Sequence, residues 1–355
     1  MSNPKRKRKS ALYANIIFSL IALTSLGITI VCLLINHSIR EDLENSNEVN
    51  RSLSDYADTH IYTQSDLDSA VTSAKEEFKE EEKNMLLSEM KDRLSSGDSA
   101  YALFRDIFPD DLIVYVDNSY VFYPISDIYA HNDYVSDNFI KDETTDEITY
   151  TDGNGNVISA KGIDVSRHNG TIDWKKVKDE GIEFAFIRVG YRGSSNGGLV
   201  LDELFEENIK GAIDNGIDVG VYFFTQAITV EEAVEEADFV LDAIEPYNLK
   251  YPVVWDIETL EGRAEDLDAK TRTDCAIAFL DRIEGAGYKP MLYGNLMSML
   301  YLLETDRIEG YDKWFAYYHF PDYYPYEYSI WQYSSKGKVS GIEGDVDLNI
   351  CMKKY

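Results

Sequence analysis

Residues 251–258, YPVVWDIE, form an apolar run that ends in two carboxylates, Asp256 and Glu258. Side chains on a strand alternate between its two faces, so these acids face the same way while Ile257 faces the other. Like charges at short range repel each other, and the repulsion raises the pKa of one partner. A pair of acids split in this way suits acid and base chemistry. A strand that runs into an acidic loop is the simpler alternative.

This stretch belongs to a longer alternation of short apolar strands and helical patterns that begins at residue 160, which is typical of parallel β/α architecture. Beyond Met291 the connections between strands become short. We therefore predict, over residues 160–355, an α/β fold: an irregular TIM-like β/α barrel of about eight strands and about five helices. The predicted strands are 162–166, 184–190, 218–224, 252–258, 290–294, 314–318, 328–333 and 345–349, and the main predicted helices are 173–181, 202–215, 230–244 and 271–286.

In such barrels the chemistry lies at the carboxyl ends of the strands, where the loops converge. Four carboxylates stand at predicted strand ends, and six polar or aromatic side chains near them are predicted to contact a substrate. Loop capping is the alternative role for Asp164 and Asp347, a buried ion pair for Arg188, and core packing for the aromatic rings. The acids are Asp164, Asp256, Glu258 and Asp347; the predicted contacts are Arg188, Tyr222, Asn295, Tyr317, Trp331 and Gln332.

The balance of charge restricts the partners of the chain. The formal net charge is −30, from 64 acidic and 34 basic residues. This argues against a nucleic-acid partner, because binding to phosphates needs a basic face. No cofactor motif and no clustered metal-ligand pattern occurs either, so we predict neither a cofactor nor a metal site.

The exception to the acidic composition is the basic run at residues 5–9, which directly precedes residues 11–35. The latter carry no charged side chain and are long enough to span a bilayer. The positive-inside rule keeps the basic run in the cytoplasm. We predict a cytoplasmic tail at 1–10, a transmembrane signal anchor at 11–35 and a single-pass location in the cell membrane with the remainder extracellular; a cleaved signal peptide is the alternative.

Two further segments precede the barrel. Residues 36–96 are polar and acidic, with Leu67, Val71, Phe78 and Met85 at helical spacing, which predicts a helical stalk. The short heptad pattern allows a weak homodimer through this stalk, with a solvated single helix as the alternative. Residues 97–159 predict a small α+β module of unassigned role, with a hairpin formed by 112–116 and 120–125.

Residues 161–355 resemble the glycoside hydrolase family 25 muramidases, the Chalaropsis-type lysozymes. The motifs that carry the resemblance occur in the family's order. One departure follows the first motif: His168 and Asn169 stand where the family often has an aromatic residue and Gln, so polar contacts in the first loop are expected to differ. The motifs are GIDVS at 162–166, GVYFF at 220–224 with Gln226 and Ala227, PVVWDIE at 252–258, KWFAYY at 313–318 and WQYSSKGKVSGIEGDVDLN at 331–349.

The resemblance implies hydrolysis of the β-1,4 bond between N-acetylmuramic acid and N-acetylglucosamine in peptidoglycan. By family position Glu258 is the general acid, and Asp256 either orients the 2-acetamido group or acts as nucleophile, while Asp164 and Asp347 line the same site. The residue types agree, because glycoside cleavage needs one carboxylic acid for the leaving oxygen and a second carboxylate for the oxocarbenium-like centre. Two alternatives stay open: a non-catalytic peptidoglycan-binding tether or scaffold, and an enzyme for chitin or another acetamido sugar polymer.

Overall fold

The computed structural model describes residues 28–29, 31, 33–35, 63–97, 99–116, 118–258, 262–320 and 323–355. Among these residues, one compact unit comprises Asp110–Tyr355 and a second ends at Pro109. The predicted cytoplasmic tail and most of the predicted membrane span lie outside the described residues. Within the described part of the chain, no helix combines the length and the apolar character that crossing a bilayer requires.

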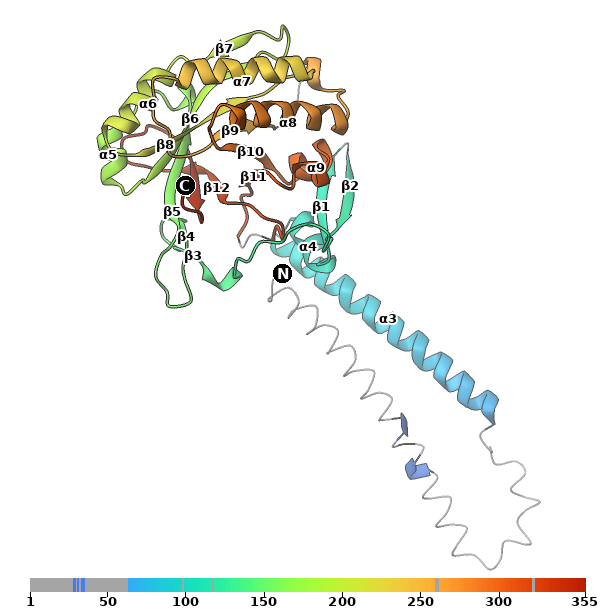
Figure 1. Cartoon of the computed structure of the whole chain (residues 1–355). Helices are drawn as coiled ribbons and strands as arrows, with labels where there is room; N and C mark the ends of the chain where they lie inside the picture. The colour runs from blue at the N-terminus through green and yellow to red at the C-terminus, as the bar shows by residue number, and fades with distance from the viewer. Residues whose placement is uncertain are drawn as a thin grey trace, which may run out of the picture. The chain divides into compact units, whose positions relative to one another are not determined.

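The unit that ends at Pro109 contains two described helices, α3 (Gln64–Ser96) and α4 (Ala100–Ile107). Helix α3 begins with a capping box between Thr63 and Asp66 and ends at Gly97, whose φ of 101° suits glycine. None of its residues is buried. The helical character predicted for the stalk is thus confirmed for 64–96 (Figure 1), while 36–62 lie outside the described residues.

The larger unit is built on a closed barrel of eight strands, and each of the eight predicted strands is confirmed. Pairing between the first two, β5 and β6, closes the barrel. A short extra strand, β7 (Leu199–Leu201), pairs antiparallel with β6 and was not predicted. The barrel strands are β5 (Ala160–Val165), β6 (Phe184–Arg192), β8 (Asp218–Phe224), β9 (Val253–Asp256), β10 (Pro290–Asn295), β11 (Asp312–Ala316), β12 (Ile330–Gly337) and β13 (Val346–Cys351).

Seven of these strands run parallel where they pair with one another, but β13 does not. It lies antiparallel to both of its neighbours, β12 and β5. The amino end of β13 therefore meets the carboxyl ends of the other strands. Asp347, at that amino end, pairs in register with Asp164 near the carboxyl end of β5.

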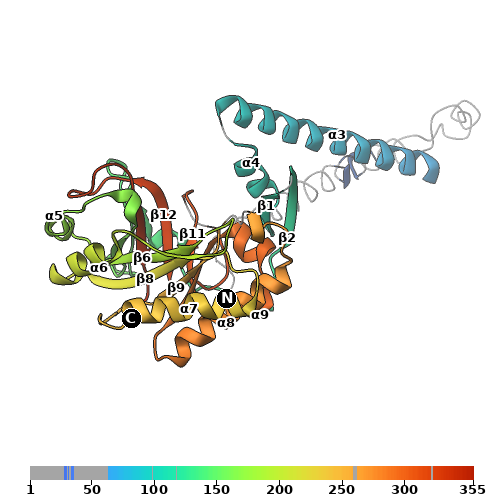
Figure 2. The same cartoon turned by 90° about the horizontal axis from the view of Figure 1, so that it is seen from above.

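The helices cover the early part of the barrel, as the short late connections predict. Helices α7 and α8 lie side by side in both views (Figures 1 and 2). In the described parts of the connections from β11 to β12 and from β12 to β13 there is no helix. The helices are α5 (Trp174–Asp179), α6 (Phe205–Asp214), α7 (Val230–Ile244), α8 (Ala269–Gly285) and the short α9 (Thr305–Ile308), with a π-helical turn at Ser298–Leu302.

Large side chains fill the interior of the barrel. The Phe186 ring stacks on Trp314 with 4.5 Å between centroids, and Phe184 lies edge-on to Phe186 at 6.0 Å. Gly162 leaves the space that Phe184 occupies, because a Cβ there would come within 2.2 Å of the ring. The barrel is thus a packed core below its mouth, as in other β/α barrels.

Residues 110–159 join the barrel in one compact unit, so the predicted boundary at 159/160 does not separate two units. The predicted hairpin is confirmed as β1 (Asp111–Val116) and β2 (Ser119–Pro124). A second pair, β3 (Phe139–Lys141) and β4 (Ile148–Tyr150), follows it. The Phe139 ring lies edge-on to Trp331 of β12, with centroids 5.3 Å apart.

Polar contacts tie this region to the connection between β11 and β12. Asn132 donates through Nδ2 to the carbonyls of Tyr324 and Tyr326 at 2.9 and 3.0 Å, and the Tyr134 hydroxyl donates to the Tyr328 carbonyl at 2.6 Å. An aromatic layer therefore lies against the late side of the barrel, where the connecting helices are missing. Burial of large aromatic surfaces makes such a layer an integral part of the core.

Phe139→Ala is expected to destabilise the whole unit of residues 110–355 by about 3 kcal/mol, because it opens a cavity against Trp331. Urea unfolding followed by tryptophan fluorescence measures the loss as a lower midpoint. Ile140→Ala is the matched control, since Ile140 is the next residue of β3 and is 49% exposed. Equal midpoints for the two variants would show that the aromatic layer does not support the barrel.

Candidate active site

Asp164 is held at the inner wall of the mouth by two side-chain amides. Gln332 donates through Nε2 to Asp164 Oδ1 at 2.9 Å, and Asn349 donates through Nδ2 to the same oxygen at 2.8 Å. All three side chains are buried. Burial and the neighbouring Asp347 raise the pKa of Asp164 well above its usual value, against the lowering effect of the two amides. The first, seventh and eighth barrel strands are thus joined through one carboxylate.

Two tyrosines and a tryptophan extend this network to the next two strands. The hydroxyls of Tyr293 and Tyr318 both donate to Gln332 Oε1, at 2.8 and 2.7 Å, and Trp314 Nε1 donates to Asn349 Oδ1 at 2.8 Å. Each amide therefore accepts hydrogen bonds on its oxygen and donates from its nitrogen to Asp164. This arrangement fixes the orientation of both amides, because the oxygen cannot face the carboxylate.

Asp256 and Glu258 stand on the wall formed by β9 and the residues after it. Asp256 is 3% exposed and its Oδ1 atom has no hydrogen-bond partner among the described residues. Burial, together with the charges of Glu258 and Asp164, raises the pKa of Asp256 well above its usual value. Glu258 is exposed at the mouth, and partial loss of water around its carboxyl also raises its pKa.

Asp347 completes the set of four acids, although not by the route that the sequence indicates. It stands at the amino end of the reversed strand β13, not at a carboxyl end. Burial and the charge of Glu258 raise the pKa of Asp347 to about 6. Asp347 pairs with Asp164, and β5, β6, β8 and β9 are parallel, so the four predicted carboxylates lie at one mouth of the barrel.

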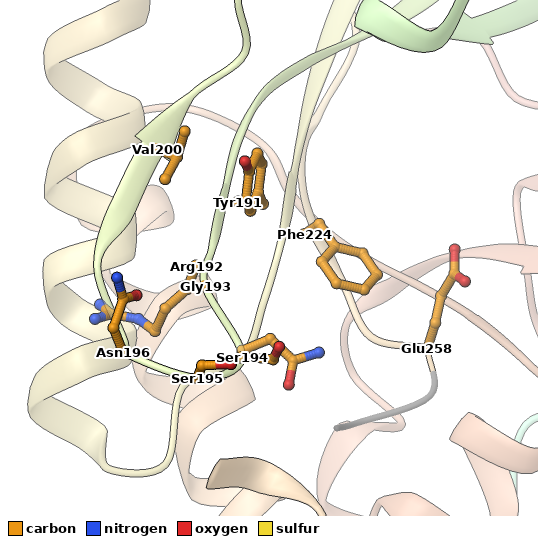
Figure 3. Close-up of a pocket in the computed structure, with 10 residues that line it drawn as sticks. Tyr191, Arg192, Gly193, Ser194, Ser195, Asn196, Val200, Phe224 and Glu258 are labelled. Atoms are coloured by element: carbon orange, nitrogen blue, oxygen red, sulfur yellow. The ribbon is translucent and has the colours of Figure 1, made fainter. Parts of the chain in front are cut away.

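A cleft of about 570 Å³ opens beside Glu258. In Figure 3, Glu258 stands on one side, the loop of residues 193–196 on the other, and the Phe224 ring between them. Tyr191 and Gln226 also line it. The loop offers hydroxyl and amide groups together with apolar rings, a lining suited to a sugar. Sequence reasoning missed this loop, because β7 and the turn before it are too short to give a periodic signal.

Two of the predicted aromatic contacts do not face the mouth. Trp331 is 0% exposed, and its Nε1 donates to the Tyr317 carbonyl at 2.7 Å. The prediction that it presents a face to a sugar ring is wrong, because its neighbour Gln332 takes the inward position and alternation turns Trp331 toward Phe139. Tyr317 likewise stacks outward on Phe315, at 6.1 Å between centroids.

Tyr318 is the inward residue at the end of β11, and sequence reasoning missed it. Trp314 and Ala316 belong to the interior cluster, so a period of two places Tyr318 on the same side and Tyr317 on the other. The two-residue period of the strand, followed from Trp314, indicates Tyr318 as the inward residue. Tyr222 packs on the interior cluster, and the charge of Asp164 contributes to raising its pKa; its contact with a sugar stays a prediction.

The remaining predicted contacts have partners within the protein. Arg188 forms an ion pair with Asp202 through Nη2 at 2.6 Å, which is the alternative role considered for it. The positive charge of Arg188 opposes the rise in the pKa of Asp256 without cancelling it. Asn295 accepts from the Ser298 amide at 3.1 Å and so caps the π-helical turn. Over the described ranges, no three His, Cys, Asp or Glu side chains are grouped so that they could hold a metal ion.

Comparison with known proteins agrees with this geometry. Residues 163–342 match the model of the family described as glycosyl hydrolases family 25. The chain belongs to this family. It is therefore a glycoside hydrolase, and the matched residues include Asp164, Asp256 and Glu258 but end before Asp347.

Individual known proteins match the chain at low sequence identity. The uncharacterized protein YegX of Escherichia coli K12 is 28% identical over 197 residues, which are 53% of this chain and 68% of YegX. Lysozyme M1 of Streptomyces globisporus is 27% identical over 213 residues, 56% of this chain and 70% of the lysozyme. The structure of the modular autolysin LytC from Streptococcus pneumoniae matches with a TM-score of 0.49 and 25% identity. That match covers 68% of this chain but only 56% of LytC.

Asp347→Asn is expected to stabilise the protein at pH 7. The folded-state pKa of Asp347, about 6, lies above the value of about 3.9 for an unfolded aspartate, so the folded state binds the proton more tightly. Stability is therefore lost as pH rises from about 4 to about 6, by on the order of 2 kcal/mol. Urea unfolding should give a higher midpoint for the variant at pH 7 and equal midpoints near pH 3.5.

Asp345→Asn is the control for this prediction, because its shift has the opposite sign. Asp345 pairs with Lys338 at 2.6 Å on the surface, and this contact lowers the pKa of Asp345. Its replacement should slightly lower the midpoint at pH 7. If Asp347→Asn also lowers the urea midpoint at pH 7, the folded state does not disfavour the ionised form of Asp347.

Tyr318→Phe is expected to lower kcat/KM about tenfold. The variant loses the hydrogen bond from the Tyr318 hydroxyl to Gln332 Oε1, which leaves Gln332, and hence Asp164, less firmly oriented. Tyr317→Phe, the adjacent and outward tyrosine, should change kcat/KM less than about twofold. Both are measured as release of reducing ends from a glycan substrate. Equal losses for the two variants would contradict the inward assignment of Tyr318.

Proposed function

We propose that the chain is an N-acetylmuramidase that cleaves the β-1,4 bond between N-acetylmuramic acid and N-acetylglucosamine in peptidoglycan. The observation that carries this proposal is the set of four carboxylates in one mouth, two of them on the β9 wall. Family membership and the relative that bears the name lysozyme support it. Hydrolysis of a glycoside needs a proton donor and a second carboxylate on such a surface.

In this proposal Glu258 protonates the leaving oxygen. It lines the cleft and is exposed, so an incoming sugar can reach it. Its raised pKa keeps a larger fraction of the carboxyl protonated at a given pH than in an ordinary glutamate. Activity should accordingly decline as pH rises through the pKa of Glu258 and the donor loses its proton.

Asp256 is proposed to accept a hydrogen bond from the N–H of the 2-acetamido group. Its buried Oδ1 atom lacks a partner among the described residues, and a buried polar atom of this kind is costly until a ligand satisfies it. An N–H donor there would lower the pKa of Asp256 and turn the acetamido oxygen toward the anomeric carbon. The competing role as nucleophile predicts a covalent glycosyl-enzyme, which intact-mass spectrometry with a 2-fluoro glycoside would detect.

Glu258→Gln is expected to reduce cleavage of purified peptidoglycan by at least about 10²-fold, because the amide cannot donate an acidic proton. Binding of the glycan in a sedimentation assay should persist. Glu206→Gln is the matched control, since Glu206 lies exposed on α6. Undiminished release of reducing ends from the Glu258 variant would exclude Glu258 as the acid.

The same experiment distinguishes the alternative functions. A non-catalytic tether would bind peptidoglycan and release no reducing ends even as the unaltered chain. A chitinase-like enzyme would release them faster from chitin oligosaccharides than from peptidoglycan. The acids at the mouth favour catalysis over tethering, because a protein that only binds glycan has no need to keep four carboxylates with raised pKa values.

We also propose that residues 11–35 anchor the chain in the cell membrane, with the barrel outside. The support is the apolar stretch and the basic run before it. A protease added outside intact cells should remove a reporter fused after Tyr355 and spare one fused before Lys5; the reverse pattern would overturn the topology. Weak dimerisation through α3 is a further proposal, for which sedimentation equilibrium over a concentration series is the test.

A further inference from the structure

A further buried carboxylate, Glu236 of α7, lies outside the barrel wall and joins three neighbouring strand ends. It is 0% exposed. Arg192 donates to it through Nε at 2.8 Å, Thr225 through its hydroxyl at 2.8 Å and Trp255 through Nε1 at 3.2 Å. These donors belong to the end of β6, the residue after β8, and β9.

The arginine in this cluster reaches the loop that lines the cleft. Its Nη1 donates to the Gly197 carbonyl at 2.5 Å, while its Nη2 donates to the Glu232 carbonyl and to Glu235 Oε2, both at 2.8 Å. The guanidinium group is 2% exposed. Arg192 is therefore fixed by α7 on one side and holds the loop of residues 193–198 on the other.

The loop is the turn between β6 and β7, which pair antiparallel up to Arg192 and Leu199, and it also contacts the segment at 262–264. The Arg263 amide donates to the Ser194 carbonyl at 3.1 Å, and the Arg263 side chain forms an ion pair with Glu232. Gly197 has a φ of 69°, and a Cβ there would come within 1.9 Å of Arg263 Nη1. The loop is thus held at its base by the β6–β7 ladder and lies between α7 and the segment at 262–264.

The position of strand β9, which carries Asp256, does not depend on Glu236 alone. Strand β9 has backbone pairing with β8 on one side and with β10 on the other. The Thr225 amide also donates to the Asp256 carbonyl at 3.1 Å. Loss of Glu236 should therefore release the loop far more than it moves Asp256 or Glu258.

We infer that Glu236, acting through Arg192, is a positioning residue that sets the width of the cleft between the 193–196 loop and Glu258. The kinetic part of this inference rests on the proposed function. Removing the carboxylate of Glu236 leaves the buried Arg192 guanidinium without its buried anionic partner. An uncompensated buried charge is unfavourable, so the Arg192 side chain no longer stays in one position. The loop then samples positions in which its hydroxyl and amide groups no longer meet the sugar.

The test compares Glu236→Gln with Glu235→Gln in the full-length chain. Glu235 is the matched control because it precedes Glu236 in α7 and also contacts Arg192, but is 60% exposed. Hydrogen–deuterium exchange of residues 193–198 should be at least about tenfold faster in the Glu236 variant and unchanged in the control. The KM for peptidoglycan should rise about tenfold while kcat falls less than about threefold, since the loop touches no reacting bond.

Arg192→Lys provides a second route if Glu236→Gln does not fold. Lysine keeps the charge beside Glu236 but cannot span from it to the Gly197 carbonyl, so the loop should again exchange faster with the barrel strands unchanged. Equal loop exchange in Glu236→Gln and Glu235→Gln, or in Arg192→Lys and the unaltered chain, would overturn the inference. A chain that does not cleave peptidoglycan would overturn the proposed function only, because loop exchange is measured without substrate.

Discussion

The barrel depends on the hydrogen bonds that hold Asp164. Two amides, from Gln332 and Asn349, meet on one carboxylate oxygen in the interior. Tyr293, Tyr318 and Trp314 fix the other ends of those amides. Through these contacts a single carboxylate from β5 is connected to β10, β11, β12 and β13. Tyr318 is 50% exposed, but Asp164, Gln332 and Asn349 are buried, so loss of any of these three leaves a buried polar group unsatisfied.

The remaining three barrel strands are joined by a second carboxylate on the opposite side of the wall. Glu236 binds donors from β6, β8 and β9, and it does so from outside the barrel. The two networks differ in what opposes the negative charge. Burial raises the pKa of both carboxylates, that of Glu236 to about 7, but only Glu236 has a positive charge, the Arg192 guanidinium, that opposes the rise. Each network thus holds one buried carboxylate, and only the outer one pairs it with an opposite charge.

The acids at the mouth oppose folding, and in the proposed mechanism they serve catalysis. Glu258 contributes to the raised pKa values of Asp164, Asp256 and Asp347, and each of those groups loses water on burial. A fold selected for stability alone would replace them with amides. Their presence is the usual conflict between stability and activity, in which repulsion is tolerated where it shifts a proton.

Much of this architecture could be predicted from local patterns. The eight strands follow from apolar runs, and the helices α5 to α8 follow from the spacing between them. The direction of β13 could not be predicted, because a strand looks the same in sequence whichever way it runs. Asp347 was therefore correctly expected at the mouth but assigned to the wrong end of its strand.

The aromatic contacts show a different limit. Residue type and proximity to a strand end favour Trp331 and Tyr317 as sugar contacts, but the alternation of side chains along each strand turns both outward. With it, Tyr318 and Gln332 become the inward pair, and their hydrogen bond at 2.7 Å agrees. The contact between Phe139 and Trp331 joins positions nearly two hundred residues apart, and no local pattern in either segment indicates the other.

That contact also explains why the barrel needs residues 110–159. A β/α barrel normally covers each strand with the helix that follows it. Here the connections after β11 are too short to do so, and the outward rings of Phe315 and Trp331 would face water. Tyr324 and Tyr328 of the connection itself pack on Phe315, and segment 125–159 supplies Phe139 against Trp331 and Tyr134 against Tyr328. The late connections contain no helix in their described parts, and the segment before the barrel covers the exposed side of these strands with aromatic side chains instead.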